Sequence, residues 1–343
     1  MTRHHELRAS AETVRLGVVD RTDEPVLTIE SGDTVSLDTW NAWGNQVTPE
    51  TTIADVGRYV AEASDAGPHD LTGPIAVHGA RPGDVLRVDL IDLRLRPHLF
   101  NLSLPGHLGI GLLAEDFADG QVRHYQLSGS GAGTRVELAP GVEIPVRPFL
   151  GYQGVAPRDA GPHSSIPPGP HGGNIDVPDL VVGSSLFLPV WADDALFCAG
   201  DAHAAQGYGE VNLTALEASV EEAVLRFTVL RGGPALSRPR AETQADYLSL
   251  AFADSLDSAA REAARDLVQE LARQHPGLSP IGAYAVASMA LDLKVSQVVN
   301  AEVGVQASVA KEIFTAPLPW FGDGSGWSEI SRDAESQSTI VPS

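Results

Sequence analysis

The chain has 343 residues, 43% of them apolar, and a formal net charge of −22 at pH 7. This length allows one large or two ordinary domains, and the lack of any apolar run of about 18 residues excludes a transmembrane helix. The acidic charge argues against nucleic acid and anionic membranes as partners and favours a neutral or cationic small molecule.

The N-terminal residues and the cysteine content both predict a protein that is not secreted. The first residues, MTRHHELRASAET, are polar and lack the apolar centre of a secretion signal. Cys198 is the only cysteine, so no disulfide can form within the chain. Because thiols stay free in a reducing compartment, we expect a cytoplasmic protein.

Short alternating apolar segments between Gly and Pro predict mainly β structure. Residues 25–37 (PVLTIESGDTVSL) predict two short strands joined by a Ser-Gly-Asp turn. In residues 82–93 (PGDVLRVDLIDL), alternation places Leu86, Val88 and Leu90 on one face and Arg87 and Asp89 on the other.

Residues 220–230 predict another strand, whereas residues 95–113 and 154–173 predict long loops. The second loop, with PRDAGPHSSIPPGPHGG, is too rich in Pro and Gly for regular structure. A loop of this length inside a globular chain is usually functional or mobile.

Helical spacing begins after about residue 250. Asp257 is predicted to cap a helix running to about Gln274, and Ser279 a second one with Pro280 at its first position, from Ile281 to about Leu293. The predicted class is therefore α+β, mainly β. We expect a β-rich core in residues 1–250 that carries the site, a helical hairpin with terminal strands in 251–327, and a mobile tail in 328–343.

The segment GDAHAAQGYGE (Gly200–Glu210) follows an apolar strand and gathers polar groups. Asp201 and His203, two residues apart, project from one strand face, and alternation adds Phe197 and Ala199 to it and leaves Cys198 on the other. Glycines at 207 and 209 let Glu210 fold back toward the pair.

A carboxylate beside an imidazole can hold a divalent metal or orient a general base. Gln206 offers an amide for a substrate carbonyl or a water. A β-bulge with a surface Asp and His is the structural alternative. Cys198 could be a nucleophile, but it lies in an apolar strand without a basic neighbour, which favours a buried inert thiol.

Other polar residues lie in loops. In HGGNID, glycines permit unusual dihedral angles that could aim Asn174 and Asp176 at a pocket, although both could instead bond their own backbone in a turn. His69 and His163 each follow Gly-Pro, and His69 is the preferred candidate near the site.

The motifs together resemble one family. GDAHAAQGYGE is similar to the G-D-x-H-x-x-Q-G-D-G-E signature of the acetamidase/formamidase family of amide hydrolases. GPHDLTGPIAVHGARPGDVL (Gly67–Leu86), PHSSIPPGPHGGNID (Pro162–Asp176) and SQVVN (Ser296–Asn300) also resemble family segments, in order. The resemblance implies a jelly-roll-like β-sandwich with appended helices, a dimer or trimer, and hydrolysis of small amides, with zinc or lactam substrates in some relatives.

Two positions depart from the family pattern. Tyr208 stands where the family commonly has Asp, and Asn41 where many members have Asp in a T-x-D-A segment. A neutral oxygen is a weaker ligand for a divalent ion than a carboxylate. We expect these departures to reshape the pocket toward amides larger than formamide or acetamide.

The predicted function is hydrolysis of a small neutral non-peptide amide by a metal-activated water. Asp201, His203 and Glu210 are the predicted ligands of a divalent metal, preferably zinc, and the catalytic residues, with Glu210 as either ligand or base. Gln206, Asn174, Asp176, Tyr208, Asn41 and His69 are the predicted substrate-binding residues. The alternatives are a lactam or larger-amide hydrolase on the same scaffold, or a catalytically weak binding protein.

Overall fold

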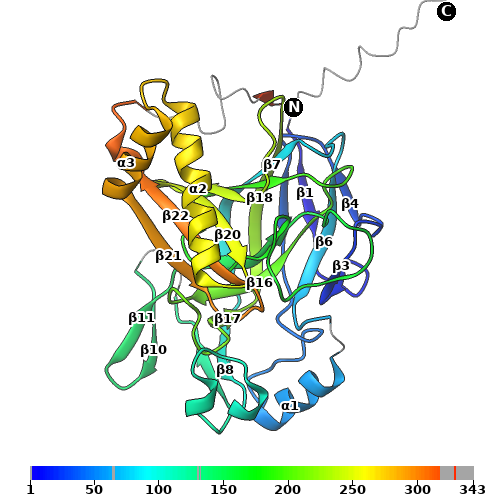
Figure 1. Ribbon diagram of the computed structural model, residues 1–343. Helices are drawn as coiled ribbons and strands as arrows, with labels where there is room; N and C mark the ends of the chain where they lie inside the picture. The colour runs from blue at the N-terminus through cyan, green and yellow to red at the C-terminus, as the bar shows by residue number, and fades with distance from the viewer. Residues whose placement is uncertain (1, 64–65, 130, 132, 317–327, 330–343) are drawn as a thin grey trace, which may run out of the picture.

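A computed structural model describes residues 2–63, 66–129, 131, 133–316 and 328–329. Most described strands belong to two large sheets (Figure 1). The ten-stranded sheet has the order β1 (His4–Leu7), β5 (Thr34–Leu37), β18 (Val220–Arg231), β7 (Val85–Leu95), β15 (Ser185–Pro189), β19 (Arg240–Glu242), β20 (Asp246–Ala253), β22 (Val303–Ala310) and β21 (Leu291–Gln297), with β23 (Ser328–Glu329) paired to β18.

The nine-stranded sheet holds the quoted signature segment. Its order is β14 (Gly172–Asn174), β12 (Phe149–Gly154), β16 (Phe197–Ala205), β17 (Leu216–Ala218), β8 (His98–Ser103) and β9 (Gln121–Gln126), while β6 (Asp70–Val77) pairs with β16, β2 (Val14–Leu16) and β4 (Leu27–Ile29). Two small sheets pair β10 (Arg135–Ala139) with β11 (Val142–Pro145), and β3 (Val18–Val19) with β13 (His163–Ser164).

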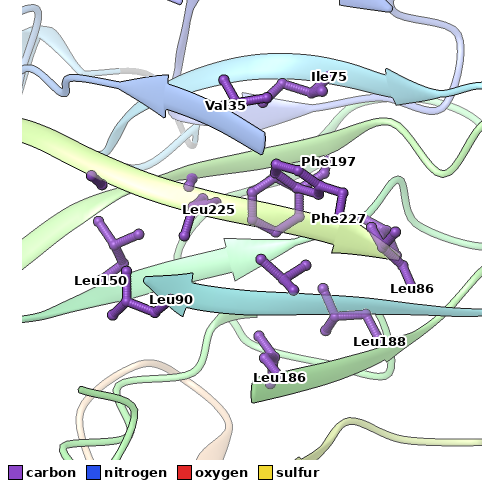
Figure 2. Packing of buried hydrophobic residues seen from close by; sticks show 14 of the residues in the cluster. Val35, Ile75, Leu86, Leu90, Leu150, Leu186, Leu188, Phe197, Leu225 and Phe227 are labelled. Carbon is purple, nitrogen blue, oxygen red and sulfur yellow. The ribbon is translucent and has the colours of Figure 1, made fainter. Parts of the chain in front are cut away.

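The main core lies between the two large sheets. Figure 2 shows Leu86 and Leu90 of β7 and Phe227 of β18 beside Ile75 and Phe197, which come from the other sheet. These side chains are buried because each strand turns its apolar alternate residues inward. The alternation predicted for residues 82–93 is confirmed, since Arg87 and Asp89 form an ion pair of 2.7 Å on the outer face.

Two helices cover the outer face of the ten-stranded sheet at the strands β20 and β22 (Figure 1). Helix α2 (Leu256–Gln274) buries Ala263, Leu267 and Leu271 against that sheet, and α3 (Pro280–Ala290) packs beside α2. This arrangement confirms the predicted α+β, mainly β sandwich with an appended helical hairpin. No helix in the described part of the chain is long and apolar enough to cross a membrane.

The helix ends differ in part from expectation. Ser255, not Asp257, caps α2, since its hydroxyl accepts the Ser258 N–H at 3.3 Å, whereas Asp257 lies in the first turn. The Ser279 cap of α3 is confirmed. However, α3 ends at Ala290, because the alternating segment LDLKVSQ pairs with β22 as strand β21.

The strands predicted in residues 25–37 and 220–230 are confirmed as β4, β5 and β18. The loop predicted over 95–113 is wrong, because β8 lies within it and pairs with β9 and β17. Residues 154–173 are mostly irregular, as predicted. Of the predicted tail, only residues 328–329 are described, and they pair with β18.

Helix α1 (Ile53–Glu62) was not predicted. It begins with a capping box, in which Thr52 and Asp55 bond each other's backbone N–H groups. Short 3-10 turns occupy Gly106–Leu108, Ala114–Asp116 and Lys311–Ile313. Figure 1 places α1 next to β8, at the lower end of the sandwich in that view.

Candidate active site

The signature segment Gly200–Glu210 begins within β16 and continues past its end, and the side chains of Asp201 and His203 lie close together. Nε2 of His203 lies 3.4 Å from Oδ2 of Asp201, which confirms their predicted proximity. The backbone of Asp201 is left-handed (φ 52°), and this break reverses the strand alternation. The predicted shared face is therefore wrong for Phe197 and Ala199, which point into the core between the sheets.

Four carboxylates surround His203 in two groups. Asp176 and Glu210 form one group with it, and Asp201 and Glu217 form the other. On the second side, Nε2 of His203 lies 3.4 Å from Oε2 of Glu217. The three predicted ligands thus fall into two groups that share the imidazole, and Glu210 returns to the histidine as expected.

Glu217 escaped the sequence analysis, although a signal exists. It is an acidic residue within the apolar run LTALEASV, on β17, and its neighbours Leu216 and Ala218 are buried. Glu217 itself is only 9% exposed and lies opposite His203 in the β16–β17 pairing. A charged residue in an apolar strand beside the signature strand is therefore the observation that could have found it.

Gln206 fixes the orientation of the His203 imidazole and places a proton on Nδ1. Its Nε2 group donates to the carbonyls of Asp176 and Ser296, both at 3.1 Å, so its oxygen must face the other way. That oxygen lies 3.0 Å from Nδ1 of His203. Nδ1 therefore donates to Gln206, and Nε2 is the nitrogen that faces Asp201 and Glu217.

Burial and crowding of charge shift the pKa values of these groups. Burial, reinforced by Asp201, raises the pKa of Asp176 to about 8. Burial and the neighbouring Asp176 raise the pKa of Glu210 well above its ordinary value. For His203, burial opposes the charged form, but Glu217 and Asp201 prevail and raise its pKa.

The backbone holds the carboxylates in uncommon conformations. Asp176, Asp201 and Glu210 all have left-handed dihedral angles, with φ of 45°, 52° and 48°. Gly151 of β12 leaves room between two of them: a Cβ there would lie 2.5 Å from Oδ2 of Asp201 and 2.6 Å from Oδ1 of Asp176. The site therefore needs a glycine at this position.

A cavity of about 680 Å³ opens above this cluster. His69, Asn174, Asp201, His203, Glu210 and Glu217 line it, as does Asn300, whose amide donates to Asp176 at 2.6 Å. The side-chain oxygen of Asn174 and one oxygen each of Asp176 and Glu210 are buried without a hydrogen-bond partner. Such atoms are available to a substrate or an ion.

Four predicted substrate-binding residues do not line this cavity: Asn41, Asp176, Gln206 and Tyr208. Asn41 lines neither of the two described cavities, and its amide donates to the carbonyl of Val47 at 2.8 Å. Tyr208 donates to Asp179 at 2.7 Å and lines a second cavity of about 520 Å³, as does Gln206. Glu210 lies in the wall between the two cavities.

Cys198 is buried with Val19, Leu71 and Tyr152, and burial raises the pKa of its thiol to about 12. Because the thiolate is the reactive form, this cysteine is inert at neutral pH. We expect Cys198→Ala to keep the activity proposed below within about tenfold of the parent, measured as kcat/KM. A loss of several orders of magnitude in a folded variant would instead identify the thiol as a nucleophile.

The fold and site define a mainly β protein with a buried carboxylate–imidazole centre beneath a mostly apolar cavity. Residues 22–164 and 160–316 match the Acetamidase/Formamidase family, and the chain belongs to that family, which confirms the predicted resemblance. It is 25% identical over 257 residues to a putative formamidase from Schizosaccharomyces pombe and 26% identical over 201 residues to an acetamidase from Mycolicibacterium smegmatis. These matches span 61% and 49% of those relatives and 60% and 42% of this chain.

Three solved structures are similar to this chain over at least 90% of its length. An acetamidase from Bacillus halodurans is 31% identical, with a TM-score of 0.78 over 90% of this chain and 98% of the other. A predicted acetamidase/formamidase from Thermoanaerobacter tengcongensis is 26% identical, with a TM-score of 0.79 over 91% and 97%. A gamma lactamase from Delftia acidovorans, 21% identical with a TM-score of 0.57 over 92% and 95%, shares the fold.

Proposed function

We propose that the protein hydrolyses a neutral, non-peptide amide to a carboxylate and ammonia or an amine. The observation that carries this proposal is the orientation of His203, whose Nδ1 is bound to Gln206 and whose Nε2 faces Asp201 and Glu217 at the floor of the cavity. Family membership and relatives named acetamidase and formamidase support the same reaction class. A cavity lined by carboxylates suits an uncharged substrate.

The donor set fits a divalent metal. Nε2 faces two carboxylates, and this arrangement favours a positive charge between them, which a proton supplies in the absence of metal and a divalent cation would supply in its place. We therefore assign the metal to Asp201, Nε2 of His203 and Glu217, with zinc preferred for this mixture of nitrogen and oxygen ligands. When bound there, such an ion would polarise the amide carbonyl and increase the acidity of a water.

The remaining residues have distinct proposed roles. Glu210 takes the proton of the attacking water and transfers it to the leaving nitrogen as the C–N bond breaks, since it lines the cavity and has an unpartnered oxygen. Asn174, with its free carbonyl oxygen in the cavity, accepts a hydrogen bond from the amide N–H group. Asp176 and Asn300 hold each other beside Glu210 and keep that side of the site polar.

Ammonia release from formamide, acetamide and a lactam series, with and without a chelator, tests this function. We expect turnover that the chelator abolishes and a divalent metal restores. Turnover of lactams alone would support the predicted lactam alternative. Binding without turnover would support the binding protein and contradict hydrolysis. The dimer or trimer and the cytoplasmic location stay predictions.

The role of Gln206 yields a prediction of its own. Replacing Gln206 with Leu removes the acceptor that holds the Nδ1 proton, so the histidine can present either nitrogen to the metal. We expect metal affinity to fall by about 10- to 100-fold in a chelator competition assay. The ¹⁵N shifts of His203 should also report a mixed tautomer. Gln126→Leu, at an exposed glutamine of β9, should change neither quantity.

A further inference from the structure

The upper part of the cavity is apolar and preformed. Phe100, Leu102 and Leu104, on and just after β8, are each less than 9% exposed and pack with Trp43 and Val60 in a small core beneath α1. All five side chains also line the cavity. Because these residues pack against one another, the apolar wall is formed without a ligand.

Trp43 is held in place by its backbone. Its own N–H donates to the carbonyl of Pro68 at 2.9 Å. The next two N–H groups, of Gly44 and Asn45, donate to Asp70 at 3.0 and 2.7 Å. Since Asp70 is 1% exposed, the loop that carries the indole is anchored to a buried residue at the start of β6.

The size and charge of the cavity do not match the smallest amides. About 680 Å³ lies in the range of roughly 300 to 1,000 Å³ typical of sites for drug-sized ligands, whereas acetamide has only a few non-hydrogen atoms. No lysine or arginine is among the described residues that line the cavity. A carboxylate on the substrate would therefore be repelled by the acidic floor.

Resting on the amide hydrolysis proposed above, we propose that the substrate is a neutral amide with an apolar group of about phenyl size. The amide lies at the carboxylate–imidazole floor, and the apolar group fills the space between Trp43 and the β8 residues. This assignment replaces Tyr208 and Asn41, which lie outside the cavity, with Trp43 and Phe100 as the residues that determine substrate size.

A set of four substrates tests the proposal: acetamide, phenylacetamide, N-benzylacetamide and 4-carboxyphenylacetamide. We expect kcat/KM for phenylacetamide or N-benzylacetamide to exceed that for acetamide by at least about tenfold. The better of these two substrates shows whether the apolar group lies on the acyl side or the nitrogen side of the amide. The carboxylated analogue should be the poorest of the aromatic amides. Acetamide as the best substrate would overturn the proposal.

A matched pair of variants on α1 and its C-terminal end locates the effect. Ala63 is exposed and lines the cavity, whereas Ala61 is exposed and does not. We expect Ala63→Trp to lower the ratio of aromatic amide to acetamide kcat/KM by at least about tenfold, and Ala61→Trp to leave it unchanged. Equal effects of the two variants, or none from Ala63→Trp, would contradict the proposed location.

Calorimetric binding of phenylacetamide and acetamide separates this proposal from the function it rests on. If no amide is hydrolysed but phenylacetamide binds at least about tenfold more tightly, the proposed function fails and the apolar site stands. If acetamide is hydrolysed and phenylacetamide neither binds nor reacts, the function stands and the proposed substrate class fails.

Discussion

Replacing His203 with alanine is expected to remove most of the bound divalent metal and to lower kcat/KM for amides by at least about 1,000-fold, or roughly 4 kcal/mol. The imidazole supplies the nitrogen donor between Asp201 and Glu217, and its removal leaves those carboxylates without a shared partner. Elemental analysis should find about one equivalent of metal per parent chain and little in the variant.

His171→Ala is the matched control, because that histidine is half-buried and belongs to neither carboxylate group. It should keep its metal, so that any loss specific to His203 is not a general effect of removing a histidine ring. A parent protein that is metal-free and fully active would exclude the metal-dependent mechanism. A His203→Ala variant that retains metal would show that the ligands lie elsewhere.

Gly151→Ala is expected to cause the second-largest loss, at least about 100-fold in kcat/KM, with a destabilisation of about 1–3 kcal/mol. The new methyl group would lie within 2.6 Å of oxygens of both Asp201 and Asp176. Both aspartates are short side chains on left-handed backbone, so they have little freedom to retreat. Activity, metal content and the unfolding midpoint should all fall.

Gly207→Ala tests the specificity of this effect. Gly207 belongs to the same signature segment, but a Cβ there would meet no atom within 4 Å. We expect that variant to keep kcat/KM within about threefold of the parent. If Gly151→Ala retains full activity, the two carboxylates tolerate displacement, and their spacing is not what the site requires.

Local patterns determined much of the fold. Alternation in residues 82–93 is a property of neighbouring residues and correctly placed Leu86, Val88 and Leu90 in the core. The Ser279 cap with Pro280 identified the start of α3 for the same reason. The family signature located Asp201, His203 and Glu210, since all three lie within one short segment of chain.

Tertiary structure decided which of these groups work together. Glu217 reaches His203 from the neighbouring strand β17, and Asp176 from the segment that follows β14, and no local pattern specifies these contacts. The left-handed backbone at Asp201 separates the face of Asp201 and His203 from that of Phe197 and Ala199, and no alternation rule in the sequence specifies such a residue. The sequence shows which carboxylates and imidazoles are present. Only strand pairing and the backbone conformation determine which carboxylates contact the imidazole of His203, and which of its two nitrogens each one faces.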